Sequence, residues 1–331
     1  SWNALITGLL EYDYGQAALE CFEQMQCESV SPNDVTLVYS LKACRTIGST
    51  YKGCEISGDI KGTGLFERDI VLGNSLVDMY VKFGWLGKAL EVFEGLMVRD
   101  VVSWNALISG YVEHEDWSGA LKWFEQMQVE GISPDSVTLV CCLKACGKLG
   151  AADKGQQIHA HSERKGLLEG EILVGNMLVD MYAKFGLLDT ALLVFDMIPM
   201  QDVDSWTSLI SGYAEYGNSE EALMWFEKMQ IAGVSPNAAT YVSILKACGN
   251  IGAIDMGKEI HAQITKEGLV QKDIMIGNAL VDMYAKCGVL VKAQEVFDEI
   301  PMPDVVSWNA LIAGFHMHGE EALNHFKQMQ H

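Results

Sequence analysis

The sequence predicts an all-α fold, a right-handed superhelical solenoid of about ten helix-turn-helix repeats. Two observations lead to this prediction. The chain repeats itself at an interval of 102 residues, which separates the tryptophans Trp2, Trp104, Trp206 and Trp308 and also the LKAC segments that begin at Leu41, Leu143 and Leu245. Within each interval, apolar residues also follow the spacing of amphipathic helices.

Each interval divides into three related segments, such as 101–135, 136–171 and 172–202, which are 35, 36 and 31 residues long. In the first of them, two apolar helix faces are separated by a break, Trp104, Leu107, Ile108 and Tyr111 and then Ala120, Leu121, Phe124 and Met127. Gly131 and Pro134 end the second helix. Because one helical hairpin cannot bury its apolar face alone, neighbouring hairpins are expected to stack around a groove.

Composition and charge limit the kind of protein further. The 331 residues are 49% hydrophobic and 20% charged, a balance typical of a folded chain with a large core. No uncharged apolar run reaches about 18 residues, so we expect no membrane partner. The nine cysteines include no C-x-x-C pair, which favours a reduced, intracellular setting over a disulfide framework. Both ends fall inside a repeat, so we expect the chain to be part of a longer protein.

Three recurring motifs carry a resemblance to a known family, SWNALISGY, LKAC followed by G and IHA, and GNALVDMYAKCG. With their alternating lengths, they resemble the P–L–S subclass of plant organellar pentatricopeptide repeat proteins over essentially the whole chain. The resemblance implies a single solenoid over 1–331 with the repeats P 1–33, L 34–69, S 70–100, P 101–135, L 136–171, S 172–202, P 203–237, L 238–273, S 274–304 and an incomplete P 305–331.

The resemblance also implies binding of single-stranded RNA at about one nucleotide per repeat. In this family the fifth and the last residue of a repeat together select the base. An Asn amide at the fifth position offers a donor and an acceptor to the Watson–Crick edge of a pyrimidine. An Asp at the last position accepts a hydrogen bond and thereby fixes which way that amide points.

Four repeats are expected to read uracil through an Asn and an Asp: Asn74 with Asp100, Asn105 with Asp135, Asn176 with Asp202, and Asn278 with Asp304. The pair of Asn3 and Asn33 resembles a looser pyrimidine reader, the pair of Thr207 and Asn237 resembles an adenine reader, and Asn309 favours a pyrimidine in the incomplete last repeat. The L repeats place Val38, Val140 and Val242 at the fifth position, where an apolar side chain cannot read a base edge by hydrogen bonding.

Family members lie parallel to their RNA, so the implied target is 5′-YnUUnUAnUn-3′, in which Y is a pyrimidine and n is undetermined. The resemblance also implies that an apolar second residue of each repeat packs against the bases. This pattern is met by Val71, Val102, Leu173, Met275 and Val306, but not by Asp204. Phosphates are expected to meet lysines on the first helices, Lys82, Lys184 and Lys286 in the S repeats and Lys42, Lys144 and Lys246 in the L repeats. These lysines matter because the formal net charge of −21 otherwise disfavours RNA.

Structural roles stay open for several of these residues. The recurring Asn is also a residue that caps helix starts, and the lysines are also typical of a solvated surface. The four tryptophans keep the apolar spacing of the first helix, so core packing is favoured over base stacking. We expect His159 and His261 to be packing residues as well, because Ser57 stands at the matching place in the first L repeat.

We therefore expect an RNA-binding tract of a mitochondrial or chloroplast factor that selects sites for C-to-U editing or other RNA processing. Protein cofactors of editing are expected partners through the L repeats, and DNA is not. The chain carries no P-C-x-x-C deaminase signature, P-loop or dinucleotide fingerprint, so we expect no catalytic site, metal or cofactor in it. One alternative is a protein-binding scaffold like the tetratricopeptide repeats, which the acidity favours but whose steady period of about 34 residues differs. The other is a nuclease, which a clustered acidic metal site would indicate.

Overall fold

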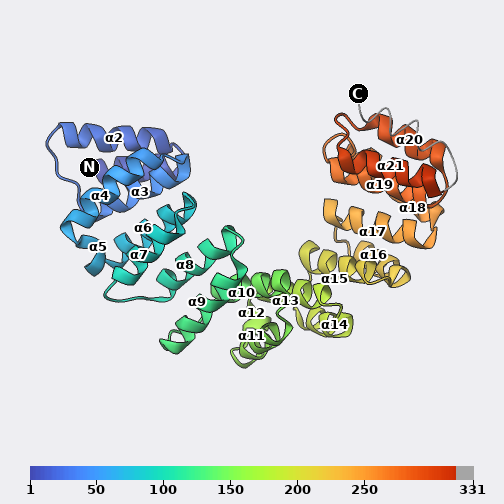
Figure 1. Ribbon diagram of the computed structural model, residues 1–331, viewed down its shortest axis with the longest axis horizontal. Coiled ribbons are helices and arrows are strands. Elements are labelled where there is room, and N and C mark those ends of the chain that lie inside the picture. Colours follow the sequence, from blue (N-terminus) through green and yellow to red (C-terminus); the bar gives the residue numbers. More distant parts are fainter. Residues whose placement is uncertain (318–331) are drawn as a thin grey trace. The chain divides into compact units, whose positions relative to one another are not determined.

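The structure is all-α, as predicted. The computed structural model describes residues 1–317, apart from the side chain of Glu169, and within them the chain forms the helices α1 to α21 and no strand (Figure 1). Residues 318–331 of the predicted last repeat lie outside the described residues. Between residues 2 and 317, every helix is too short or too polar to cross a bilayer.

Two main helices lie in each predicted repeat up to residue 304. The first helices are α1 (Trp2–Glu11), α3 (Asp34–Ile47), α6 (Ile70–Lys82), α8 (Val101–Glu113), α10 (Ser136–Leu149), α13 (Ile172–Lys184), α15 (Val203–Glu215), α17 (Ala238–Ile251), α19 (Ile274–Lys286) and α21 (Val305–Met317). The second helices are α2 (Gly15–Cys27), α4 (Thr50–Thr63), α7 (Leu86–Gly95), α9 (Trp117–Val129), α11 (Ala152–Arg164), α14 (Leu188–Met197), α16 (Ser219–Ile231), α18 (Ile254–Glu267) and α20 (Leu290–Glu299). The short helices α5 (Leu65–Arg68) and α12 (Leu167–Gly170) follow α4 and α11.

The last residue of most repeats is the N-cap of the next first helix. Asp100 and Asp135 have extended backbones, and each accepts the backbone N–H of the third helical residue, Ser103 or Thr138. The hydroxyls of these two residues accept the N–H of the cap in return, which completes a capping box. The starts of α8 and α10 are thus fixed by side chains that also belong to predicted reading pairs.

The LKAC motif packs into the core and ends at a glycine. Cys44, Cys146 and Cys248 are fully buried, and this burial raises the pKa of their thiols to about 12, about 11 and about 12. Four residues later the helices end at Gly48, Gly150 and Gly252, whose φ angles of +71°, +72° and +70° favour a residue without a Cβ. All nine cysteines are free thiols.

The hairpins stack within each of two compact units, Ser1–Ile158 and His159–His331. In the first unit, α1, α3, α6, α8 and α10 pack in succession, and α2, α7 and α9 each pack against the first helix of the following repeat. In the second unit, α13, α15, α17, α19 and α21 pack in succession. Each of α14, α16, α18 and α20 packs against the first helix of the following repeat. Stacked helical repeats are therefore confirmed in both units.

The repeated tryptophans belong to this core. Trp104 is fully buried and Trp206 is 7% exposed. Each ring meets a Phe of the preceding second helix edge to face, Phe93 or Phe195, with centroids 4.8 Å apart. For these two residues, core packing is confirmed, and their rings are not available as platforms for bases.

A glycine lets the first helix of a P repeat approach the helix of the preceding S repeat closely. In the second unit, a Cβ on Gly212 would lie 2.7 Å from the Cβ of Ala183 and 3.1 Å from Cδ2 of Leu188. The residue at the matching place in the first P repeat, Gly8, has nothing within 4 Å of such a Cβ. The two glycines therefore differ only in whether a neighbouring helix covers them.

We expect Gly212→Ala to destabilise the protein by about 1–3 kcal/mol, because the added methyl group overpacks the contact between α13 and α15. Gly8→Ala is the matched control. It should be neutral or stabilising by up to about 1 kcal/mol, since Ala favours a helix more than Gly does. Urea unfolding of both variants measures the difference, and equal stability of the two would contradict the close approach.

Candidate nucleic-acid interface

The fifth and last residues of a repeat meet because neighbouring first helices pack side by side. Asn105 lies one turn into α8, and Asp135 caps α10, which packs beside α8. The Nδ2 atom of Asn105 donates to both carboxylate oxygens of Asp135, at 2.9 Å each. The cap of one helix is thereby tied to the side chain that the preceding helix presents.

The other predicted pairs with Asn at the fifth position are joined in a similar way. Nδ2 of Asn176 lies 2.9 Å from both oxygens of Asp202, Nδ2 of Asn278 lies 3.2 Å from Oδ1 of Asp304, Nδ2 of Asn74 lies 3.4 Å from Oδ1 of Asp100, and Nδ2 of Asn3 lies 3.1 Å from Oδ1 of Asn33. Asn309 is exposed on α21.

Thr207 lies in the same place but is bound differently. Its hydroxyl donates to the carbonyl oxygen of Val203 at 2.6 Å and lies 2.7 Å from the hydroxyl of Thr240. The Oδ1 atom of Asn237 is farther away, at 3.5 Å. Asp204, the residue that breaks the apolar pattern, is exposed in the first turn of α15.

Hydrogen bonds lower the pKa of the paired carboxylates Asp135 and Asp304. Burial acts to raise the pKa of Asp135, but hydrogen bonds from Thr138, Asn105 and the backbone of Val137 lower it below its ordinary value of 3.8. At Asp304, the backbone N–H of Ser307 is the main cause of a lowered pKa. An ionised carboxylate only accepts hydrogen bonds, so the NH₂ group of the paired Asn faces it and the amide oxygen points elsewhere.

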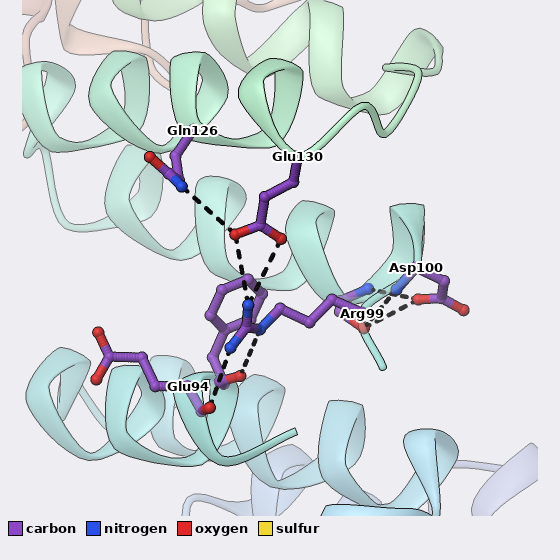
Figure 2. Close-up of polar contacts among 7 residues, drawn as sticks. Glu94, Arg99, Asp100, Gln126 and Glu130 are labelled. Carbon is purple, nitrogen blue, oxygen red and sulfur yellow. Dashed lines mark hydrogen bonds and ion pairs between the residues drawn. The ribbon is translucent and has the colours of Figure 1, made fainter. Parts of the chain in front are cut away.

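Figure 2 shows how the residue before Asp100 anchors the loop that carries this cap. Nε and Nη2 of Arg99 donate to the carbonyl oxygens of Phe93 and Glu94, both at 3.0 Å, and Nη1 lies 3.4 Å from Oε1 of Glu130, the C-cap of α9. The two backbone bonds go to carbonyl groups in the last turn of α7. They hold the chain between α7 and α8 and so help to position Asp100.

The predicted base-packing residues are exposed beside the pairs. Val71, Val102, Leu173, Met275 and Val306 are between 55% and 63% exposed. In the first unit, a cavity of about 420 Å³ is lined by Val71, Val102 and Val137 together with Asn74, Asp100 and Asn105. In the second unit, a cavity of about 540 Å³ is lined by Met275, Val306, Asn278, Asp304 and Lys246. Apolar side chains and hydrogen-bonding pairs thus share the same cavities.

The first L repeat forms a smaller cavity without such a pair. It measures about 300 Å³, and its lining includes Val35, Val38, Tyr39 and Val71. The second residues of the first two L repeats, Val35 and Val137, are 48% and 51% exposed. These two residues were not among the predicted base-packing residues, although they stand at the second position of their repeats as the predicted ones do.

The structure divides the predicted phosphate-binding lysines into two groups. Nζ of Lys184 lies 2.5 Å from Asp180 and Nζ of Lys286 lies 2.7 Å from Asp282, one helical turn away. These pairs offset part of the positive charge expected there. Lys42, Lys82, Lys144 and Lys246 are exposed and form no ion pair within the described part of the chain.

The repeated histidines have structural partners. Nδ1 of His159 lies 2.9 Å from the hydroxyl of Tyr182, and His261 meets Tyr284 at the same distance. Burial lowers the pKa of both imidazoles. Their interpretation as packing residues is confirmed. Residues 1–317 contain no group of three or more His, Cys, Asp or Glu side chains arranged to hold a metal ion.

Two models of pentatricopeptide repeats match the sequence of this chain. The model of the PPR repeat family matches residues 1–45, 99–148 and 201–250, and the PPR repeat model matches residues 74–101, 176–203 and 278–302. The chain therefore belongs to the family of pentatricopeptide repeat proteins.

Three relatives from Arabidopsis thaliana align with essentially the whole chain. Pentatricopeptide repeat-containing protein At4g33990 is 37% identical over 99% of this chain and 40% of its own length. The chloroplastic protein At4g18520 is 34% identical over 100% and 53%, and the mitochondrial protein At1g06140 is 32% identical over 100% and 60%. The chain thus spans about half the length of these relatives.

Among solved structures, the pentatricopeptide repeat protein PPR10 in complex with an 18-nt psaJ RNA element has a similar fold. The TM-score is 0.79 with 20% sequence identity, over 96% of this chain and 47% of that one. At this identity the similarity establishes the fold, which is that of stacked helical repeats.

The lowered pKa of Asp135 predicts how stability changes with pH. A carboxylate whose pKa is lower in the folded state stabilises the fold above its unfolded pKa, and this stabilisation is lost as the pH falls through the folded value. We expect the difference in free energy of unfolding between wild type and Asp135→Asn to be largest above about pH 5 and to shrink below about pH 4. Urea unfolding at pH 3, 4, 5 and 7 measures it, and a difference that does not change with pH would contradict the assignment.

Proposed function

We propose that this chain binds single-stranded RNA sequence-specifically, at about one nucleotide per repeat, with the target 5′-YnUUnUAnUn-3′. The observation that carries the proposal is the hydrogen-bonded pair of fifth and last residues, repeated along the first helices and flanked by exposed apolar side chains. A flat base fits between two such apolar side chains, and its edge then meets the polar pair.

The orientation of the amide explains the preference for uracil. Nδ2 of Asn105 gives one N–H to Asp135, so a second N–H and an oxygen lone pair remain for a base. Uracil offers a carbonyl oxygen and the N3–H group, which complement that donor and acceptor. Where Asn33 replaces the carboxylate, its own amide is able to turn, which fits a looser choice between the pyrimidines.

Relatives support the wider role. PPR10 binds RNA in the solved complex, and relatives of this chain are chloroplastic or mitochondrial proteins. We extend the proposal to an organellar transcript, at a site where C-to-U editing or another processing step is directed. Protein cofactors of editing are the partners proposed for the L repeats, whose Val38, Val140 and Val242 offer no hydrogen bond to a base.

A protein-binding scaffold is the competing function, and one observation favours it. The net charge of −21 repels a polyanion, and two of the six lysines proposed to meet phosphates are paired with Asp side chains. The hydrogen-bonded pairs argue against it, because a peptide groove does not require an amide held beside a carboxylate at successive repeats.

Titration with labelled RNA tests the proposal directly. We expect the chain to bind YnUUnUAnUn at least tenfold more tightly than a control RNA whose specified bases are exchanged, at about 0.1 M salt. Fluorescence anisotropy measures both affinities. Equal, weak binding of the two RNAs would favour the protein-binding scaffold.

A single reading residue should control a single nucleotide. We expect Asn105→Ala to remove the preference for uracil at the fourth nucleotide and to leave the preference at the sixth, which Asn176 reads. Asn218→Ala is the control, because Asn218 is exposed before α16 and its side chain makes no capping hydrogen bond. Affinities for RNAs that differ only at nucleotide four measure the effect. An unchanged preference in Asn105→Ala would contradict the proposal that Asn105 reads this nucleotide.

A further inference from the structure

A buried hydroxyl touches the oxygen of the reading amide and also lies beside the cap, since Oγ of Ser307 is 3.0 Å from Oδ1 of Asp304. Oγ of Ser307 donates to Oδ1 of Asn278 at 2.5 Å, and Oγ1 of Thr138 and Thr36 donate to Oδ1 of Asn105 and Asn3 at 2.5 Å and 2.7 Å. Each hydroxyl belongs to the third residue of the following repeat, and all three residues are at most 1% exposed. The carboxylate holds the NH₂ end of the amide of Asn278 and Asn105, and the hydroxyl holds the oxygen end.

The polarity of the third residue of a repeat matches the polarity of the fifth residue of the preceding repeat, at every repeat boundary. Where the fifth residue is Asn or Thr, the next repeat has a hydroxyl at its third position, Thr36, Ser103, Thr138, Ser205, Thr240 and Ser307. Where the fifth residue is Val, the next repeat has an apolar residue there, Leu72, Val174 and Ile276. A polar fifth residue is therefore always followed by a hydroxyl, and an apolar one never is.

Capping alone does not explain this pattern. The S repeats also begin with a helix, and Asp69 caps α6 by accepting the N–H groups of Val71 and Leu72 without any hydroxyl. At α13, Glu171 makes no side-chain capping bond, and the helix begins there nonetheless. A helix start therefore does not require a hydroxyl at the third position, whereas a hydroxyl accompanies every polar fifth residue.

We propose that the third-position hydroxyl of the following repeat is a positioning residue for base selection where it contacts the oxygen of the reading amide, as Ser307, Thr138 and Thr36 do. Resting on the proposed RNA binding, the inference states that Ser307 holds Oδ1 of Asn278 so that the amide presents its donor and acceptor in the order that uracil requires. A turned amide presents them in the order that cytosine requires. The hydroxyl thus discriminates uracil from cytosine without touching the base.

The chain supplies a matched control at another S-to-P boundary. The helices α8 and α21 begin with the same sequence, VVSWNALI, and both Ser103 and Ser307 complete a capping box with the preceding Asp. Oγ of Ser103 donates to Oδ1 of Asp100 at 3.0 Å, and Oδ1 of Asn74 has no hydrogen-bond partner. Ser103→Ala therefore removes the same capping bonds as Ser307→Ala but no contact to a reading amide.

The test measures the ratio of affinities for RNAs with U or C at a single nucleotide, in the full chain at about 0.1 M salt. Nucleotide nine reports on Ser307 and Asn278, and nucleotide three reports on Ser103 and Asn74. We expect Ser307→Ala to reduce the U-to-C ratio at nucleotide nine by roughly fivefold, as fits the loss of one hydrogen bond. Ser307→Thr should restore the ratio, and Ser103→Ala should leave the ratio at nucleotide three unchanged.

A merely structural role would weaken binding of both RNAs alike and leave each ratio as it was. The inference is overturned if Ser307→Ala keeps the wild-type ratio, or if both Ala variants reduce their ratios equally. Should Ser307→Ala fail to fold by circular dichroism, Thr138→Val provides the same comparison at nucleotide four with little change in side-chain shape. If the wild type shows no preference between U and C at nucleotide nine, the proposed RNA reading fails, which is a different result.

Discussion

The N-cap at the start of each first helix is the interaction on which the candidate interface depends. A cap such as Asp135 must lie where the free N–H groups of α10 point, and the stacking of α10 against α8 fixes where that is relative to Asn105. One carboxylate thereby starts a helix and orients a side chain of the preceding repeat. Burial in the stack, helix geometry and the presentation of a polar pair are therefore coupled, and a change at the cap alters all three.

The positive charge available to an RNA backbone is sparse, and its distribution follows the repeat types. In the S repeats, Asp180 and Asp282 lie one turn before Lys184 and Lys286 and pair with them. In the L repeats, Lys42, Lys144 and Lys246 are exposed, and Lys246 lies in the cavity that contains Asn278. With a net charge of −21, non-specific attraction to phosphates is weak, so affinity under the proposed function depends mainly on contacts with the bases.

The fold was predictable because the same pattern of apolar residues recurs in every interval of 102 residues. The spacing of Trp104 and Trp206 indicated a buried face, and each first helix from α3 onward begins where a repeat was predicted to begin. The pairing of Asn105 with Asp135 was implied by the family resemblance, and the two side chains are hydrogen-bonded. The contact between Ser307 and Asn278 was not predicted, because the rule that the family resemblance implies covers the fifth and last residues of a repeat and not the third. The pairing of Lys184 with Asp180 has the i, i+4 spacing of ion pairs on a helix, so the sequence itself contains the signal for it.

The L repeats show why the polar groups at a repeat boundary change together. A buried hydroxyl opposite Val38 would have no acceptor on that side chain, and an unpaired buried polar group costs about 1–3 kcal/mol. Leu72, which stands at that third position, is fully buried and leaves no such group. The same exchange removes any hydrogen bond to a base edge, so the cavity beside Val38 is able to hold a base only by contact with apolar side chains. Under the proposed function, two repeats of three in each interval of 102 residues carry a polar fifth residue for choosing a base, and the L repeat carries none.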